Sequence, residues 1–128
     1  MNENKINEKL SVLIVGNNDI NSIIKKIIPQ TEYRVVTAKS YNEALQKVKK
    51  NDFDLIMMDM DLPDGDWVKT ILKIRDMAGD VNIVTMSNIN NRDIEQSVRE
   101  QRVMYYVVKP FEDNEIKSIM EHLSQKKQ

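Results

Sequence analysis

In the stretch DLIMMDMDLPDGD (residues 54–66), a short apolar run leads into a loop, and four of the last ten residues of the stretch are aspartates. Pro63 and Gly65 interrupt the chain inside this loop. Carboxylates that lie so close together repel one another unless solvent, a cation or a proton separates them. Three kinds of site could use such a loop: a metal-binding loop, the nucleophile motif of a phosphatase, or a single aspartate that accepts a phosphoryl group.

The length and composition of the chain narrow the possible functions. We expect its 128 residues to form one domain at 10–124, with flexible termini at 1–9 and 125–128. The net charge of −1 leaves no basic excess to bind nucleic acid, and the absence of cysteine excludes disulfides and thiolate chemistry. No apolar run approaches transmembrane length, and the N-terminus lacks the apolar core of a signal peptide. We therefore expect a cytoplasmic protein with no nucleic-acid or membrane partner.

Short apolar runs predict five strands, separated by amphipathic stretches that predict five helices. The strong runs are continuous rather than alternating, which is typical of strands buried on both faces of a sheet. The runs are SVLIVG (11–16), YRVVTA (33–38, weaker than the others), DLIMMD (54–59), NIVTMS (82–87) and MYYVVK (104–109). The predicted helices are 19–28, 41–50, 66–77, 91–101 and 112–123. Five repeats of strand and helix predict a doubly wound α/β fold with a parallel sheet.

Two of the predicted helices carry specific local signals. Ser40 and Glu43 form a capping-box signature at the start of the helix at 41–50. The helix at 66–77 has an apolar set that we expect to face the core. This set is Val68, Ile71, Leu72 and Ile74.

The parallel sheet also predicts where a site would lie. In an open parallel sheet, ligands bind beyond the carboxyl ends of the strands. Asp59 ends the third predicted strand, and Lys109 ends the fifth. We therefore expect Asp59 to point out of one edge of the sheet with Lys109 beside it.

Two of the three readings of the acidic loop fit poorly. Counted from Asp59, an EF-hand would need an acid where Pro63 stands, glycine where Asp64 stands and glutamate where Thr70 stands. The pair Asp59 and Asp61 matches the Asp-x-Asp motif of haloacid-dehalogenase phosphatases. Those enzymes continue that motif to threonine or valine, not proline, and no later Gly-Asp-x-x-x-Asp follows here. A phosphatase of this type is thus the less favoured alternative.

From about 11 to 123 the chain resembles the receiver domain of bacterial two-component response regulators. The motifs DLIMMDMDLPDGD, IVTMSN and YVVKPF carry the resemblance. It implies that Asp59 is the phospho-acceptor, that Ser87 and Tyr106 are the hydroxyl and aromatic switch positions, and that Lys109 binds the phosphoryl group. It also implies a flavodoxin-like fold, with strand order 2-1-3-4-5 and five helices.

The resemblance implies a Mg²⁺ site as well, and here the chain departs from the family. Receivers hold the ion with a pair of acids after the first strand, with the acceptor, and with the carbonyl two residues beyond it. Gly16 and Asn17 stand at the positions of the acidic pair, and Asp19 is better placed as an acid in the first turn of the helix. We expect a weak Mg²⁺ site built from Asp59, Asp61 and Asn17, because two carboxylates are missing.

Two further positions differ from the family, since receivers tend to have glycine at both. Trp67 is expected to be a half-buried helix residue near the acidic loop. Arg102 precedes the last strand, and we expect the turn there to differ from that of other receivers.

The resemblance predicts a signalling module, not an enzyme. A histidine kinase or phosphotransfer protein would phosphorylate Asp59, and the output would be contact with a protein target, or homodimerisation, through residues 91–123. The alternative is a phosphorylation-independent pseudo-receiver that acts as a binding or scaffold module. The missing acids at 16 and 17 favour this alternative, whereas intact Asp59, Ser87 and Lys109 favour phosphotransfer.

Overall fold

The computed structural model describes residues 9–126, which form five strands and five helices in strict alternation. The strands are β1 (Leu10–Val15), β2 (Tyr33–Ala38), β3 (Leu55–Asp59), β4 (Asn82–Ser87) and β5 (Tyr105–Val108). The helices are α2 (Asn18–Ile27), α3 (Tyr41–Lys50), α4 (Trp67–Ala78), α5 (Arg92–Glu100) and α6 (Asp113–Lys126). Most of the termini expected to be flexible lies outside the described residues, and α6 continues two residues beyond the expected domain end at 124.

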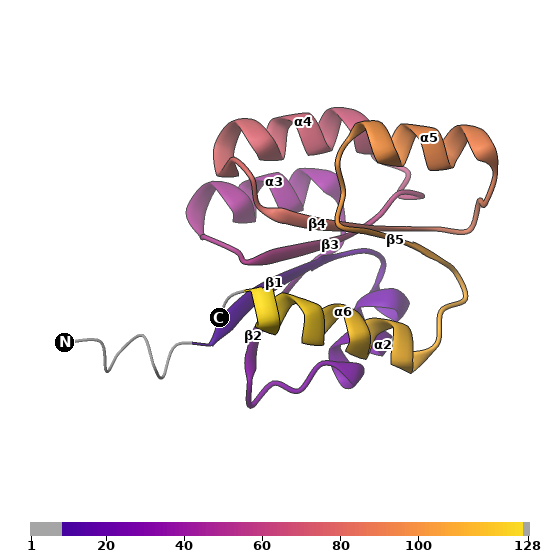
Figure 1. Cartoon of the computed structure of the whole chain (residues 1–128). Helices are drawn as coiled ribbons and strands as arrows, with labels where there is room; N and C mark the ends of the chain where they lie inside the picture. The colour runs from indigo at the N-terminus through magenta and orange to yellow at the C-terminus, as the bar shows by residue number, and fades with distance from the viewer. Residues whose placement is uncertain (1–8, 127–128) are drawn as a thin grey trace.

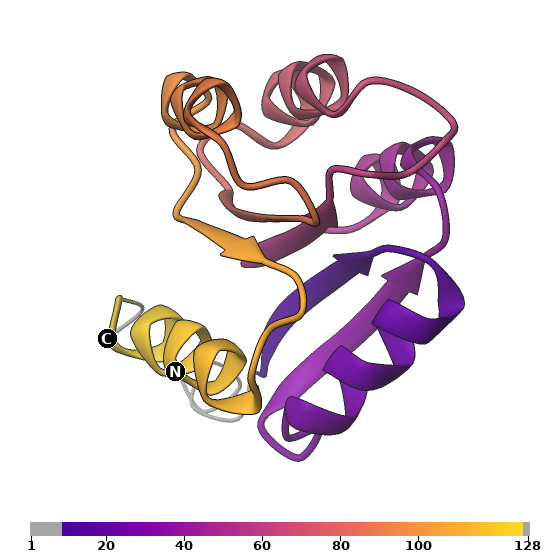
Figure 2. The same ribbon diagram turned by 90° about the vertical axis from the view of Figure 1, so that its right-hand side faces the viewer.

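The five strands form one parallel sheet in the order β2-β1-β3-β4-β5. Helices α2 and α6 cover one face, and α3, α4 and α5 cover the other (Figures 1 and 2). The predicted α/β class and the strand order implied by the receiver resemblance are both confirmed. Among residues 9–126, no helix is long and apolar enough to cross a membrane.

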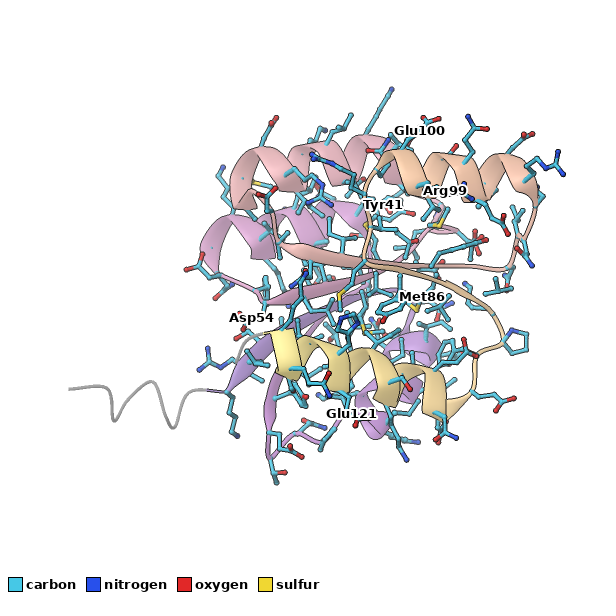
Figure 3. The ribbon with its side chains drawn as sticks, in the orientation of Figure 1. Tyr41, Asp54, Met86, Arg99, Glu100 and Glu121 are labelled. Atoms are coloured by element: carbon cyan, nitrogen blue, oxygen red, sulfur yellow. The ribbon has the colours of Figure 1, made fainter. Side chains whose placement is uncertain are left out.

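The central strands β1 and β3 supply both hydrophobic cores because their side chains alternate between the two faces of the sheet. Val12 and Ile14 pack with α2 and α6, whereas Leu13 and Val15 pack with α3 and α4. Figure 3 shows Met86 of β4 between the sheet and the layer of α2 and α6. Each fully buried aliphatic side chain contributes about 1.5–3 kcal/mol to stability. These cores hold the strand ends, and therefore the site, in fixed positions.

Strand β5 is not buried on both faces, so the prediction made from the run MYYVVK was wrong. Tyr105 is 38% exposed, and only Val107 is fully buried within this strand. The reason is its place at the edge of the sheet, where β4 is its single neighbour. A continuous apolar run does not show whether a strand lies at the edge of the sheet or in its centre.

Helix α4 also departs from its predicted burial. Ile71 and Ile74 are fully buried, but Leu72 is 54% exposed. Each helical residue turns by about 100°, so the residue next to Ile71 points away from the sheet. The expectation that Leu72 faces the core was therefore wrong.

Side-chain caps define where the helices begin. The Ser40 hydroxyl accepts a hydrogen bond from the backbone N–H of Glu43, and the Glu43 carboxylate accepts one from the backbone N–H of Lys39. The predicted capping signature at α3 is thus confirmed. Asp66 caps α4 with its carboxylate, which accepts from the backbone amides of residues 68 and 69. This cap fixes the end of the acidic loop that follows β3.

Candidate functional site

The carboxyl ends of β3, β4 and β5 meet at one edge of the sheet and bring three predicted site residues together. Asp59 is the last residue of β3, and Ser87 is the last residue of β4. Lys109 follows β5, and its backbone N–H donates to the carbonyl oxygen of Ser87 at 2.9 Å. The peptide bond between Lys109 and Pro110 is cis. The site is therefore built from strand ends whose positions the sheet determines.

Asp59 is 2% exposed, and both of its carboxylate oxygens have partners. Lys109 Nζ lies 2.9 Å from Asp59 Oδ2, and the backbone N–H of Asp61 donates to Asp59 Oδ1 at 2.8 Å. The Tyr41 hydroxyl donates to the backbone carbonyl oxygen of Asp59 at 2.7 Å. A carboxylate whose charge is offset and whose orientation is fixed meets the requirements of a nucleophile.

The Asp61 carboxylate points back into the site. The Ser87 hydroxyl donates to Asp61 Oδ1 at 3.0 Å, and the backbone N–H of Asn88 donates to Asp61 Oδ2 at 2.8 Å. Lys109 Nζ lies 3.3 Å from the same Oδ2, so one lysine contacts both aspartates. Burial by itself would raise the pKa of Asp61, but the hydrogen bonds from Asn88 and Ser87 and the charge of Lys109 lower it below its usual range.

Tyr106 is joined to this cluster through the loop between β4 and α5. Its hydroxyl donates to the carbonyl oxygen of Ile89, and the backbone N–H of Ile89 donates to Ser87 Oγ at 3.0 Å. A phenol is protonated at neutral pH, and burial raises the pKa of Tyr106 still further, so its hydroxyl is available as a donor. The two expected switch residues, Ser87 and Tyr106, are therefore linked by a single residue of the loop.

The chain uses Gly16 and Asn17 for packing and capping. Asn17 Oδ1 accepts the backbone N–H of Ile20 at 2.9 Å and caps α2. A Cβ atom at residue 16 would lie 3.1 Å from Asn21 Oδ1 and 3.1 Å from Ile20 Cγ2. The buried Asn21 side chain donates to the carbonyl oxygens of Gly16 and Ala38. Asn21 therefore takes up the space into which a side chain at position 16 would extend.

The residues present do not match the Mg²⁺ donor set that the family implies. Within residues 9–126, no three acidic or histidine side chains are grouped so that they could hold a metal ion. Asp59 and Asp61 are the two carboxylates at the site, and Lys109, Ser87 and backbone amides already engage their oxygens. Asp19 lies in the first turn of α2, as expected from the sequence.

Sequence reasoning missed three contributors to the site. Tyr41 is the first residue of the predicted helix at 41–50, and an apolar pattern does not show where a phenol hydroxyl will bond. Asn88 contributes its backbone N–H, which any residue could supply, and the signal for it was its position directly after β4. Asn21 gave no signal other than its place on α2 facing the first strand end.

Comparison with known proteins shows the family to which this chain belongs. The response regulator receiver domain family matches residues 12–121. The chain is 25% identical to sporulation initiation phosphotransferase F of Bacillus subtilis, over 88% of this chain and 90% of that protein. It is 30% identical to the two-component response regulator ARR22 of Arabidopsis thaliana, over 89% and 83% respectively. Its match to the two-component response regulator ORR21 of Oryza sativa covers only 16% of that longer protein.

Solved structures show the same fold. A CheY-like receiver domain protein from Methanospirillum hungatei superimposes with a TM-score of 0.83 at 20% identity, covering 94% of this chain and 98% of that chain. The response regulator TrrA from Thermotoga maritima, solved in complex with Mg(2+)-BeF, superimposes with a TM-score of 0.76 at 24% identity, covering 89% and 98%. The family match spans most of the chain, and the chain belongs to the response regulator receiver domain family of two-component systems.

Proposed function

We propose that Asp59 accepts a phosphoryl group from a histidine kinase or a phosphotransfer protein. The observation that carries this proposal is the buried Asp59 carboxylate at the end of β3, held 2.9 Å from the ammonium group of Lys109. A cation at this distance offsets the charge of the nucleophile and of the incoming phosphoryl group. Ser87 donates to Asp61 at 3.0 Å, and Lys109 contacts both Asp59 and Asp61, which supports a role for the Ser87 hydroxyl in binding the phosphoryl group.

The transfer itself is a displacement at phosphorus. A carboxylate oxygen of Asp59 forms a bond to phosphorus, while the bond between phosphorus and the donor nitrogen or oxygen breaks. The electron pair of the broken bond leaves with the donor group. Lys109 and Ser87 would then bind the phosphoryl oxygens. We propose that Mg²⁺ binds this site weakly, because Gly16 and Asn17 supply no carboxylate.

We propose that the domain acts as a signalling module and not as an enzyme, with its output on the face formed by α5, β5 and α6. The hydrogen bonds from Ser87 through Ile89 to Tyr106 connect the site around Asp59 to this face. Tyr105 is exposed there, and Figure 3 shows Glu100 and Glu121 on the outer sides of α5 and α6. The occupant of this face would be a downstream protein or a second copy of the chain.

A phosphorylation-independent role remains the second candidate, favoured by one observation. The donors that would bind a phosphoryl group already bind the Asp61 carboxylate. A receiver domain whose donors are already bound to Asp61 can present a fixed surface to a partner without phosphorylation.

Labelling with acetyl phosphate separates the two candidates. We expect label at Asp59 in the wild-type protein and none in Asp59→Asn, whose side chain has nearly the same shape. Circular dichroism should show that both proteins are folded. Label that persists in Asp59→Asn, or that maps to Asp61 or Asp64 by mass spectrometry, contradicts the assignment. A folded wild-type protein that takes no label supports the phosphorylation-independent role.

A further inference from the structure

We propose that the Asp61 carboxylate occupies the site where a phosphoryl group on Asp59 would bind. Through its contacts with Ser87 and Asn88, it would hold the loop after β4 in place without phosphorylation. The inference rests on the proposed function only in taking Ser87 and Lys109 as the groups that would hold a phosphoryl group on Asp59. It goes further in assigning a role to Asp61, whose side chain was expected to serve a weak metal site.

The contacts of Asp61 are those expected of a bound anion. Its two oxygens receive the hydroxyl of Ser87, the backbone N–H of Asn88 and the ammonium group of Lys109, at 3.0, 2.8 and 3.3 Å. These donors come from the end of β4, from the loop that follows it and from the end of β5. Three convergent donors, one of them charged, form an oxyanion cradle. In this chain the cradle holds a carboxylate of the chain itself.

A phosphoryl group on Asp59 would compete for this cradle. Lys109 Nζ already lies between the carboxylates of Asp59 and Asp61, and Ser87 directs its hydroxyl to Asp61. A phosphoryl group bears two negative charges and cannot share these donors with a carboxylate without strong repulsion. Phosphorylation of Asp59 therefore requires the Asp61 side chain to leave.

The cradle also sets the conformation of the adjacent loop. Ser87 donates to Asp61 and at the same time accepts the backbone N–H of Ile89, whose carbonyl oxygen accepts the Tyr106 hydroxyl. Asp61, Ser87, Ile89 and Tyr106 thus form one continuous chain of hydrogen bonds. A carboxylate that keeps Ser87 in place keeps the whole chain in place, which is the task otherwise given to a phosphoryl group.

The main chain permits a clean test, because the backbone of Asp61 has a separate role. Its N–H donates to Asp59 Oδ1, and this bond does not depend on the side chain at position 61. Asp61→Ala removes the carboxylate, and Asp61→Asn keeps its size while removing its charge. Asp64→Asn is a matched control, since Asp64 accepts backbone amides of residues 41 and 42 and contacts none of the cradle donors.

The experiment combines two measurements on the full chain. Amide resonances of Asn88 and Ile89 are recorded by NMR without phosphodonor, and the rate of label incorporation at Asp59 is measured with acetyl phosphate. We expect both Asp61 variants to shift the two amide resonances and to take label about tenfold faster, because a charge-assisted group no longer has to be displaced. Asp64→Asn should change neither. The same spectra show whether the core resonances of β1 and β3 are retained.

Each outcome bears on the proposal. Unchanged Asn88 and Ile89 resonances in both folded Asp61 variants overturn it, and so does slower labelling of these variants. If the resonances shift but no protein takes label, the phospho-acceptor role of Asp59 fails while the role of Asp61 in holding the loop stands. Should Asp61→Ala fail to fold, the isosteric Asp61→Asn decides the question.

Discussion

The Tyr41 hydroxyl donates a 2.7 Å hydrogen bond to the backbone carbonyl oxygen of Asp59. The two residues are 18 positions apart and belong to α3 and β3. Burial raises the pKa of Tyr41 above its usual range, and the charge of Asp59 raises it further, so the phenol stays a neutral donor. The bond anchors the backbone of the proposed phospho-acceptor to the helix layer on one face of the sheet.

We predict that Tyr41→Phe lowers the free energy of unfolding by about 1–2 kcal/mol, because the Asp59 carbonyl loses a buried partner. Urea denaturation measures this loss. The control is Tyr105→Phe, which should cost less than about 0.5 kcal/mol because the Tyr105 hydroxyl bonds to the exposed His122. Equal losses in the two variants would show that the Tyr41 hydroxyl has no special role.

Asn17→Asp should tighten Mg²⁺ binding by about tenfold, since one added carboxylate strengthens a hard-cation site. Aspartate can cap α2 through one oxygen as asparagine does, and it leaves its second oxygen for the ion. Fluorescence of Trp67, the single tryptophan, and calorimetry measure the change. Receiver-like Mg²⁺ affinity in the wild-type protein would contradict the proposed loss of the site.

Gly16→Asp, in contrast, should destabilise the fold. Its Cβ would lie 3.1 Å from both Asn21 Oδ1 and Ile20 Cγ2, so these side chains must move. We expect a loss of about 1–2 kcal/mol in the free energy of unfolding. A double variant at 16 and 17 would thus bind Mg²⁺ less well than the charge count suggests. If Gly16→Asp were as stable as the wild-type protein, the Asn21 side chain would have moved without loss of stability, and the argument would be wrong.

Two positions with positive φ should respond in opposite directions to glycine and alanine. Arg102 has φ 54°, and Arg102→Gly should raise stability by about 0.5–1 kcal/mol, because glycine adopts this conformation without strain. The bond that the Arg102 carbonyl accepts from Arg75 is retained in this variant. Gly79 has φ 63° and ψ −128°, and Gly79→Ala should lower stability by about 1–2 kcal/mol. Thermal melting measures both, and the same sign in both variants would contradict the argument.

The lowered pKa of Asp61 predicts how stability depends on acid. A carboxyl group whose pKa is lower in the folded than in the unfolded state stabilises the fold fully above its unfolded pKa of about 4. This contribution is lost as the pH falls through the folded value. Wild-type stability should therefore fall more steeply below about pH 4 than that of Asp61→Asn. Denaturation across this range measures the slopes, with Asp80→Asn as a control for charge removal.

The proposed output face can be tested once a partner has been captured or a dimer detected. Tyr106→Ala and Arg99→Glu should weaken the complex by about tenfold or more, because Tyr106 lies on β5 and Arg99 lies on α5 at this face. Lys50→Glu at the end of α3 is the control, since α4 separates α3 from α5 (Figure 2). Lys47 is unsuitable because it bonds to the Thr37 carbonyl and pairs with Glu43. Loss of binding in the control alone would place the interface elsewhere.

Much of this protein could be predicted from local patterns. Continuous apolar runs predicted five strands, and the amphipathic stretches between them predicted five helices, because each pattern is local in the sequence. A parallel sheet brings the carboxyl ends of its strands to one edge, so Asp59 and Lys109 could be expected there from the apolar runs. The resemblance to receivers added Ser87. The substitutions Gly16 and Asn17 were also visible in the sequence, as was the replacement of glycine by Arg102.

The tertiary structure decided which neighbours each of these groups would have. The exposure of β5 depends on its place at the edge of the sheet. The pattern of apolar residues within a strand does not show how many neighbouring strands it has. The direction of the Asp61 side chain depends on donors at Ser87, Asn88 and Lys109, which lie 26 to 48 positions along the chain. A loop aspartate can face solvent, a metal or its own chain, and only the donors that the fold brings within about 3 Å decide among them.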